Sequence, residues 1–187
     1  LDVPYCEADN SVGMSGYMED TLTMRRLIFT RGLPGSGKSS LIRVLGLATH
    51  TLSPESLRMM VSGYAMNPGG EPVINQEANT TAWTTVFRLL EERMSSGDTT
   101  VVDAVHVQPD NPMHYLELAS RYGYQVMCLD FTGLPMDIVN EGNRRRPASA
   151  VVPDGSMRFF STVLAQNPIE VIEQAASERD IPFTTVD

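Results

Sequence analysis

The chain has 187 residues, 42% of them hydrophobic and 20% charged, which is typical of one globular domain and excludes a disordered chain. No apolar run approaches the ~18–20 residues of a membrane span, and no secretory signal is found, so we expect a cytoplasmic protein without membrane contact. The net charge of −9 disfavours a broad, non-specific nucleic-acid-binding surface but leaves local basic sites open. Cys6 and Cys128 lie too far apart in sequence to indicate a disulfide framework or a zinc site.

The elements expected along the chain alternate between strands and helices. Residues 1–24 show no periodic pattern and are expected to form a flexible extension, so the folded domain should span residues 25–187. Strands are expected at 26–31, 48–52, 99–105, 125–131 and 181–186. Helices are expected at 38–47, 54–62, 76–96, 113–122, 136–145, 157–164 and 169–177, and loops at 63–75 and 146–155. This alternation predicts an α/β fold, with a parallel sheet sandwiched between helices.

A glycine-rich segment lies between the first expected strand and helix. Residues 32–39 read GLPGSGKS and match the pattern G-x-x-x-x-G-K-[ST] at every fixed position. Its glycines allow successive backbone N–H groups to line an anion site at a helix N-terminus. Lys38, the only lysine among 14 basic residues, can contact β- and γ-phosphates, and Ser39 offers a hydroxyl to Mg²⁺. The residues expected to bind a nucleoside triphosphate are Gly32, Pro34, Gly35, Ser36, Gly37, Lys38, Ser39 and Ser40.

An aspartate is expected at the carboxyl end of a buried strand. Asp103 follows the β-branched run at 99–102, and ligands of open α/β sheets bind where parallel strands end. We therefore interpret Asp103 as a magnesium ligand, direct or through water; the alternative is a residue that caps the next turn. His106, three residues later, is interpreted as a loop histidine that stabilises local structure.

Two further groups of charged residues can serve phosphoryl transfer. Glu55 and Arg58 share one face of the helix expected at 54–62, where a carboxylate can accept a hydroxyl proton and an arginine can bind an acceptor phosphate. Spacing alone favours the other interpretation, an ordinary i,i+3 ion pair on an exposed helix face. Residues 143–153 read NRRRPASAVVP, an arginine cluster that can close over a nucleotide as a lid or simply stabilise the end of a helix.

Taken in order, these segments resemble the kinase domain of the bacteriophage polynucleotide kinase family and the related P-loop kinases of bacterial RNA repair. The matching stretches are GLPGSGKSS (32–40), SPESLR (53–58), TVVDAVHVQPD (100–110), MHYLELASRYGYQVMCLDF (113–131) and NRRRPASAVVP (143–153). The resemblance implies a P-loop kinase fold with an arginine lid. It also implies magnesium-dependent transfer of the ATP γ-phosphate to a 5′-hydroxyl of DNA or RNA, in a bacterium or a phage-infected host.

The resemblance also assigns roles by position. It places Lys38, Glu55, Arg58 and Arg146 in catalysis, Ser39 and Asp103 at Mg²⁺, and Arg144 and Arg145 at the nucleotide as rivals for the lid position. Glu55 falls where the family usually has an aspartate, so its carboxylate is one methylene further from the backbone. Residues 103–106 (DAVH) only approximate the D-x-[TA]-[NH] segment of the family.

Other acceptors remain open at the level of sequence. Related phage kinases phosphorylate 5-hydroxymethyluracil within DNA, a reaction in which Tyr64 or Trp83 could stack on the base, although Trp83 also suits the core. The acidic charge also agrees with a small-molecule kinase. If the substrate is a nucleic acid, the same charge favours a short or locally gripped one over a long duplex. A guanine-nucleotide switch is excluded, because its N-K-x-D motif needs a second lysine. The oligomeric state is not predicted.

Overall fold

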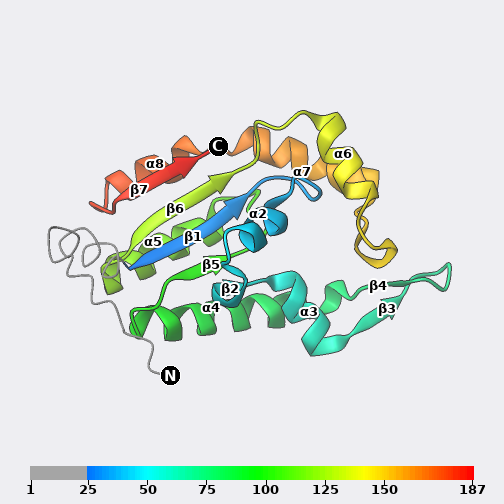
Figure 1. Cartoon of the computed structure of the whole chain (residues 1–187), viewed down its shortest axis with the longest axis horizontal. Helices are drawn as coiled ribbons and strands as arrows, with labels where there is room; N and C mark the ends of the chain where they lie inside the picture. Colours follow the sequence, from blue (N-terminus) through cyan, green and yellow to red (C-terminus); the bar gives the residue numbers. More distant parts are fainter. Residues whose placement is uncertain (1–24) are drawn as a thin grey trace, which may run out of the picture.

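A five-stranded parallel sheet forms the centre of the molecule (Figure 1). The computed structural model describes residues 25–187, so the extension predicted at residues 1–24 lies outside the described residues. The strand order is β2-β5-β1-β6-β7. The strands are β1 (Arg26–Arg31), β2 (Thr51–Leu52), β5 (Thr100–Val102), β6 (Gln125–Asp130) and β7 (Phe183–Val186). The helices are α2 (Lys38–Val44), α3 (Pro54–Ser62), α4 (Asn79–Ser95), α5 (Asp110–Tyr122), α6 (Met136–Arg144), α7 (Asp154–Gln166) and α8 (Glu170–Ser177).

The topology places the end of β1 at the centre of the sheet. β1 pairs in parallel with β5 on one side and β6 on the other, with Ile28 opposite both Val101 and Met127. The chain leaves β1 towards β2, returns to β5, and then crosses β1 to reach β6. In such sheets the ligand crevice lies at the carboxyl ends of the strands, where the connections diverge. The predicted α/β class is therefore confirmed, and the segment after β1 is where a ligand should bind.

The two faces of the sheet are covered unequally. Leu27 and Phe29 pack with residues of α4, α5 and α8 into the largest apolar cluster, while Ile28 faces a smaller cluster with Ile42 of α2. α2 has only seven residues, so few of its side chains reach the sheet. The spacing in the expected helix at 38–47 points Val44 and Leu45 inward; this is wrong, because they are 82% and 52% exposed.

The segment at residues 63–75 forms a hairpin and not the loop that its glycines and prolines indicate. β3 (Tyr64–Met66) pairs antiparallel with β4 (Pro72–Ile74). Asn67 forms the turn, because its side-chain Oδ1 accepts the N–H groups of Gly69 and Glu71. Strands of three residues are too short to show a two-residue period. In Figure 1 this hairpin extends away from the sheet beyond α3.

Several boundaries also differ from the sequence prediction. The strand expected at 48–52 is a 3₁₀ turn, η1 (Ala48–His50), followed by the two residues of β2, and the strand expected at 99–105 ends at Val102. Two further 3₁₀ turns occur: η2 (Gln76–Ala78) precedes α4, and η3 (Ala148–Ala150) lies in the loop expected at 146–155.

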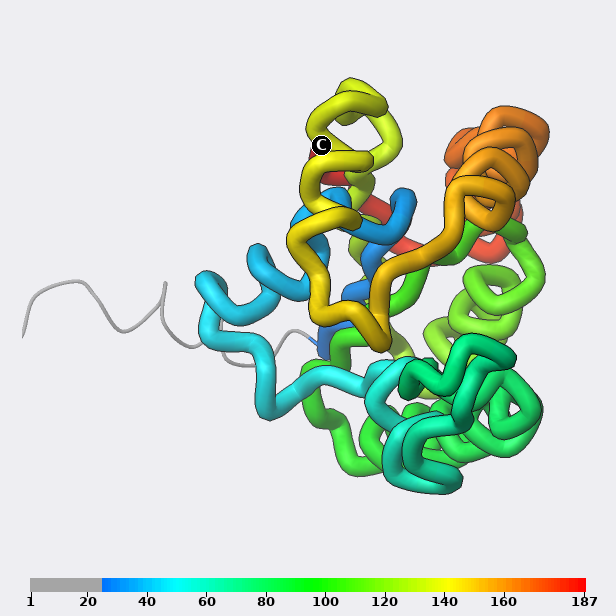
Figure 2. The backbone as a smooth tube through the Cα atoms, turned by 90° about the vertical axis from the view of Figure 1, so that its right-hand side faces the viewer, coloured from blue at the N-terminus to red at the C-terminus, as the bar shows by residue number. Residues whose placement is uncertain are grey.

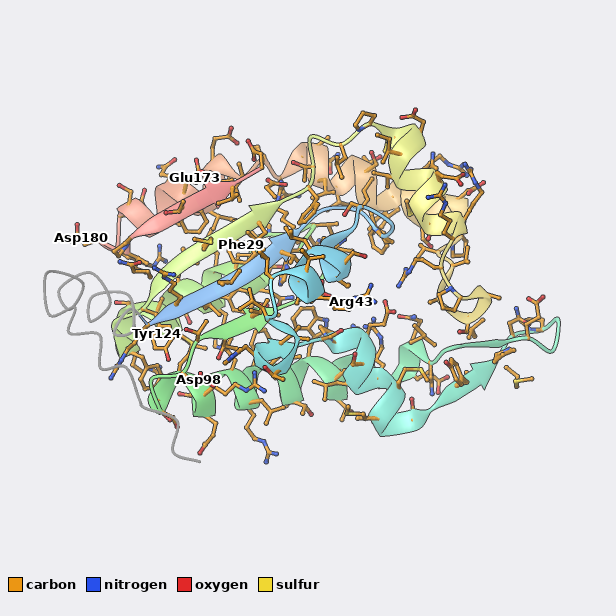
Figure 3. The ribbon with its side chains drawn as sticks, in the orientation of Figure 1. Phe29, Arg43, Asp98, Tyr124, Glu173 and Asp180 are labelled. Atoms are coloured by element: carbon orange, nitrogen blue, oxygen red, sulfur yellow. The ribbon has the colours of Figure 1, made fainter. Side chains whose placement is uncertain are left out.

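A hydrogen bond lies at the end of the sheet opposite to the carboxyl ends of the strands. There the Tyr124 hydroxyl donates to the Asp98 carbonyl at 2.8 Å, and Figure 3 shows both residues.

Candidate active site

The glycine-rich segment joins β1 to α2, in the strand–loop–helix setting that the sequence predicts. Gly37 is the N-cap of α2 and has φ 91°, a left-handed conformation that glycine adopts without steric cost. Gly35 has φ 89°. Left-handed glycines of this kind allow a loop to turn N–H groups towards one concave site at the positive end of the following helix. This arrangement can hold the phosphates of a nucleotide.

The lid helix α6 rests directly on this phosphate loop through a pair of glycines. A Cβ added to Gly142 would lie 2.1 Å from the Gly35 carbonyl oxygen, and one added to Gly35 would lie 2.4 Å from the Val139 oxygen. Only glycine permits this approach of two backbones. Asn143, the next residue, closes the base of the lid, because its side chain donates to Val152 O at 2.8 Å and accepts from Val152 N. Gly142 matches no motif, and the sequence prediction missed it.

Lys38 is buried inside the loop that precedes it. Its Nζ donates to the carbonyl oxygens of Gly32 at 2.9 Å and Leu33 at 2.7 Å, and lies 3.2 Å from Ser36 Oγ. Burial lowers the pKa of Lys38 from 10.5 to about 8, partly offset by the nearby carboxylates of Asp103 and Glu55. The ammonium group is therefore charged at neutral pH and lies at the centre of the site, within reach of an incoming phosphate.

Two oxygen groups meet beside the phosphate loop. Ser39 Oγ donates to Asp103 Oδ2 at 2.5 Å, and the second carboxylate oxygen lies 3.2 Å from Thr30 Oγ1. Oxygen ligands of this kind suit Mg²⁺, which usually takes one or two protein ligands and completes its shell with phosphates and water. Residues 25–187 contain no cluster of three or more His, Cys, Asp or Glu side chains that could hold a metal without a nucleotide. Ser39 and Asp103 therefore fit a cation that arrives with its nucleotide.

Glu55 and Arg146 connect α3 to the lid. The Nη2 atom of Arg146 lies 2.8 Å from each carboxylate oxygen of Glu55, although 91 residues separate the two in sequence. The side chains are 44% and 22% exposed, so the pair lines an open site and is not part of the core. Ser53 fixes the start of α3, because its Oγ accepts the N–H of Ser56. Arg146 follows α6, which packs on the phosphate loop through Gly142 and Gly35, so the pair lies on the side of the loop that the lid covers. Glu55 raises and Arg146 lowers the pKa of Lys38.

Helical spacing suggested an ion pair between Arg58 and Glu55, but the structure does not show one. Arg58 Nη1 donates instead to Asn79 Oδ1 at 2.6 Å, at the start of α4. Its Nε is buried and has no hydrogen-bond partner among residues 25–187, and burial lowers the pKa of this guanidinium. An unsatisfied buried N–H group is costly, so a change of conformation that gives it a partner would be favoured. Asn79 was not predicted, because the contact joins two helices and follows no local pattern.

The three adjacent arginines of the lid have different environments. Arg144 and Arg145 both pair with Glu141 on the exposed side of α6, at 2.8 Å and 3.0 Å, and these contacts lower the pKa of Glu141. Arg146 alone pairs with Glu55. A cavity of about 440 Å³ between α6 and the phosphate loop is lined by Gly35, Ser36, Gly37, Asp137, Ile138, Glu141, Gly142 and Arg145. The structure thus separates Arg146, beside the loop and α3, from Arg145, beside this cavity.

The lid also contacts the hairpin. After α6, the chain descends towards the hairpin and returns to α7, a path visible in Figure 2, and η3 contacts β4. The lid therefore contacts both the hairpin, through η3, and α3, through Arg146 and Glu55. Of the predicted residues, Asp103 contacts Ser39 of the loop and Glu55 contacts Arg146. Arg144 lies on the exposed side of α6 with its Glu141 partner.

His106 has a structural environment. It is buried, its Nδ1 lies against the Thr30 carbonyl oxygen, and its Nε2 lies 2.9 Å from the Tyr115 hydroxyl. Burial lowers the pKa of His106 from 6.5 to about 4, so the ring is neutral at neutral pH. This agrees with its interpretation as a residue that stabilises local structure.

Comparison with known proteins places this arrangement in a family. Residues 27–166, well over half of the chain, match the family model described as an AAA domain. The chain belongs to this family. No curated protein matches this AAA domain by sequence. Among the helices of residues 25–187, none is both long and apolar enough to cross a bilayer.

Solved structures share the fold of this AAA domain. A candidate kinase from Chloroflexus aurantiacus is 16% identical with a TM-score of 0.59, and each chain covers 88% of the other. Kti12 from Chaetomium thermophilum, solved with ADP-AlF3, is 16% identical with a TM-score of 0.57 over 86% of this chain and 88% of that one. In the Pnkp1/Rnl/Hen1 RNA repair complex, the match is 16% identical with a TM-score of 0.59; it covers 76% of this chain and 45% of that one. These likenesses establish the P-loop kinase fold alone.

Proposed function

We propose that this AAA domain is an ATP-dependent kinase that transfers the γ-phosphate to a hydroxyl of DNA or RNA, in the first place a 5′-hydroxyl. The observation that carries the proposal is the contact of the Glu55 carboxylate with the lid arginine Arg146, which follows the helix that packs on the phosphate loop. Glu55 and Arg58 belong to the SPESLR segment that resembles polynucleotide kinases. The likeness to Pnkp1 of an RNA repair complex and to Kti12 with ADP-AlF3 supports both the acceptor class and the nucleotide.

The nucleotide would bind through the backbone of the phosphate loop. The N–H groups at the start of α2 would hold the β-phosphate, and Lys38 would exchange its contacts with Gly32 and Leu33 for phosphate oxygens. Ser39 and Asp103 would hold Mg²⁺, which when bound neutralises charge on the β- and γ-phosphates. Arg145 and the cavity beside α6 lie where the nucleoside can extend from the loop.

The acceptor would approach between α3 and the lid. Glu55 accepts the proton of the attacking hydroxyl, whose oxygen then forms a bond to the γ-phosphorus as the bond to the ADP oxygen breaks in line. Arg58, whose Nε has no partner, binds the phosphate next to that hydroxyl. Arg146 neutralises charge that develops on the transferred group. ADP leaves with the former bridging oxygen.

Arg146 must change partners for this reaction to proceed. In the structure both oxygens of Glu55 contact Arg146, so the carboxylate is held away from an acceptor hydroxyl. The γ-phosphate of ATP competes for the same guanidinium, because it carries more charge than a carboxylate. We therefore expect ATP binding to move Arg146 to the phosphate and release Glu55 to act as the base.

The charge around the acceptor site favours a substrate that is gripped over a short length. Between Arg58 and Arg88 the chain contains no lysine or arginine, and this stretch includes the hairpin and Glu71 and Glu77. A long duplex would find no basic residues there to neutralise its phosphates. A single-stranded or exposed end, bound mainly through Arg58 and the lid, fits better. We place the enzyme in the cytoplasm of a bacterium or of a phage-infected host.

One observation favours a second acceptor, a 5-hydroxymethyluracil base within DNA. Tyr64 on β3 is 55% exposed and can stack on an extruded base. Trp83 cannot do so without rearrangement, because it packs with its ring 5.7 Å from Phe87 and 6.1 Å from His106. Only one of the two predicted stacking residues is thus available.

A panel of acceptors tests these alternatives. The protein is incubated with [γ-³²P]ATP and Mg²⁺ together with 5′-hydroxyl DNA, 5′-hydroxyl RNA, hydroxymethyluracil DNA or free nucleosides, and the labelled position is mapped. Label at the 5′ end of an oligonucleotide is expected. Label confined to an internal base would support the second acceptor, and label confined to free nucleosides would replace both with a small-molecule kinase.

A further inference from the structure

A fully buried threonine lies behind Asp103. Thr30 is the penultimate residue of β1 and has no exposed surface. Its Oγ1 lies 3.2 Å from Asp103 Oδ1 and 2.9 Å from Ala104 O, and it accepts the Ala104 N–H at 3.1 Å. A single hydroxyl therefore connects the strand that leads into the phosphate loop with the residues that follow β5.

This hydroxyl restricts the Asp103 carboxylate. The terminal torsion of an aspartate is broad, so an isolated carboxylate samples many orientations. Here each of its oxygens has a hydroxyl neighbour: Ser39 donates to Oδ2 at 2.5 Å, and the single proton of Thr30 Oγ1 is shared between Oδ1 at 3.2 Å and Ala104 O at 2.9 Å. Contacts on both oxygens restrict the rotation of the carboxylate beside Ser39.

Thr30 is itself held rigidly from behind. Its carbonyl oxygen contacts His106 Nδ1, which must carry the ring proton because a carbonyl can only accept. His106 Nε2 then accepts from the Tyr115 hydroxyl at 2.9 Å. Close by, the N–H of Gly32 donates to Val105 O at 3.0 Å. Residues 103–106 are thus joined to residues 30–32 at several points, and the orientation of Asp103 is fixed relative to the phosphate loop.

We propose that Thr30 is a positioning residue, which orients the Asp103 carboxylate towards a divalent cation shared with Ser39. This proposal depends on the proposed function in one respect: Asp103 and Ser39 hold the divalent cation that binds together with the nucleotide. Groups that orient metal-binding carboxylates act on cation affinity, typically by about 10- to 100-fold, without touching the cation. No motif identifies Thr30, because its role depends on a contact between two strands.

The test measures cation binding without any transfer reaction. Free Mn²⁺ is titrated by electron paramagnetic resonance in the presence of the full chain and a non-hydrolysable ATP analogue, for the wild type and for T30V. Valine keeps the shape of threonine and removes only the hydroxyl. We expect about 10-fold weaker Mn²⁺ binding in T30V, with the affinity for the analogue unchanged when no metal is present.

Two variants control for packing and for general destabilisation. T30S retains the hydroxyl and should bind Mn²⁺ like the wild type. T100V makes the same change at an equally buried position of β5, where the Thr100 hydroxyl reaches only Asp98 O at 3.5 Å, and should also bind normally. If T30V does not fold, T30C is measured instead, because the cysteine thiol is a weaker hydrogen-bond donor of similar size.

Wild-type Mn²⁺ affinity in folded T30V or T30C would overturn the proposal. So would an equal loss in T30S or in T100V, since the hydroxyl at position 30 would then not be the cause. Failure of the kinase proposal would appear differently, as absence of label in every acceptor while Mn²⁺ binding still depends on Thr30.

Discussion

Arg146 contacts both carboxylate oxygens of Glu55 through a single nitrogen atom, Nη2, at 2.8 Å each. The contact joins the lid to the helix that carries the proposed base, across 91 residues of sequence. It also means that the structure holds the proposed base and the lid arginine against each other. ATP would separate them, so that the carboxylate becomes free only when a γ-phosphate is present.

This competition predicts that E55Q binds ATP more tightly than the wild type. Loss of the Glu55 charge frees Arg146 for the γ-phosphate, and a partly exposed ion pair is worth ~0.2–1 kcal/mol, which corresponds to a gain of up to about five-fold. Isothermal titration calorimetry without acceptor measures the affinity. ADP, which lacks the γ-phosphate, should show a smaller gain. An equal gain in the R146Q background would contradict the exchange and point to general charge repulsion.

The buried ammonium of Lys38 predicts that ATP affinity falls as pH rises through about 8. In the free protein the pKa of Lys38 is lowered to about 8, whereas phosphate oxygens around it would raise that pKa in the complex. Binding therefore takes up a proton above pH 8 and not at pH 7, and the affinity falls by up to about ten-fold per pH unit. Calorimetry at pH 7 and pH 9 in two buffers of different ionisation enthalpy counts the protons. The K38M variant should lose this pH dependence, and its persistence there would assign the proton to another group.

The contact between α6 and the phosphate loop predicts a large cost for G142A. Its added methyl would overlap the Gly35 carbonyl, so α6 must shift, and overpacking of this kind typically costs ~1–3 kcal/mol of unfolding free energy. ATP affinity should fall as well, because the loop itself is displaced. G155A, at the start of α7, meets no atom within 4 Å and is the matched control. Chemical denaturation and ATP titration of both variants provide the measurement; equal stability of the two would show that α6 does not press on the loop.

Arg58 is predicted to act on the acceptor and not on ATP. In R58Q the buried Nε–H is lost, so the KM of a 5′-hydroxyl oligonucleotide should rise, by about ten-fold or more for a lost charged hydrogen bond of ~1.5–3 kcal/mol. The ATP affinity should stay within two-fold. R88Q changes the net charge equally at an exposed position of α4 and should leave both constants unchanged. A weakened ATP affinity with a normal acceptor KM would place Arg58 at the nucleotide instead.

Sequence patterns predicted the features of this protein that depend on neighbours along the chain. The phosphate loop, the boundaries of β1 and α3, and the helical face of Glu55 and Arg58 follow from short-range spacing. Contacts between distant segments gave no such signal, so the Glu55–Arg146 pair, the Gly35–Gly142 contact and the Thr30 hydroxyl were missed. The hairpin escaped because its strands have three residues each. The hydrophobic pattern also placed Val44 inward, whereas this last residue of α2 is exposed and Ile42 is the buried residue that packs against the sheet.

The rate of γ-phosphate transfer in E55Q tests the central claim most directly. Single-turnover transfer from [γ-³²P]ATP to a 5′-hydroxyl oligonucleotide is compared between the wild type, E55D and E55Q, at saturating ATP. If Glu55 accepts the acceptor proton, E55Q should lose about 10²- to 10⁴-fold in rate while still binding ATP, and E55D should retain measurable transfer. A wild-type rate in E55Q would show that the carboxylate beside the phosphate loop is not the base.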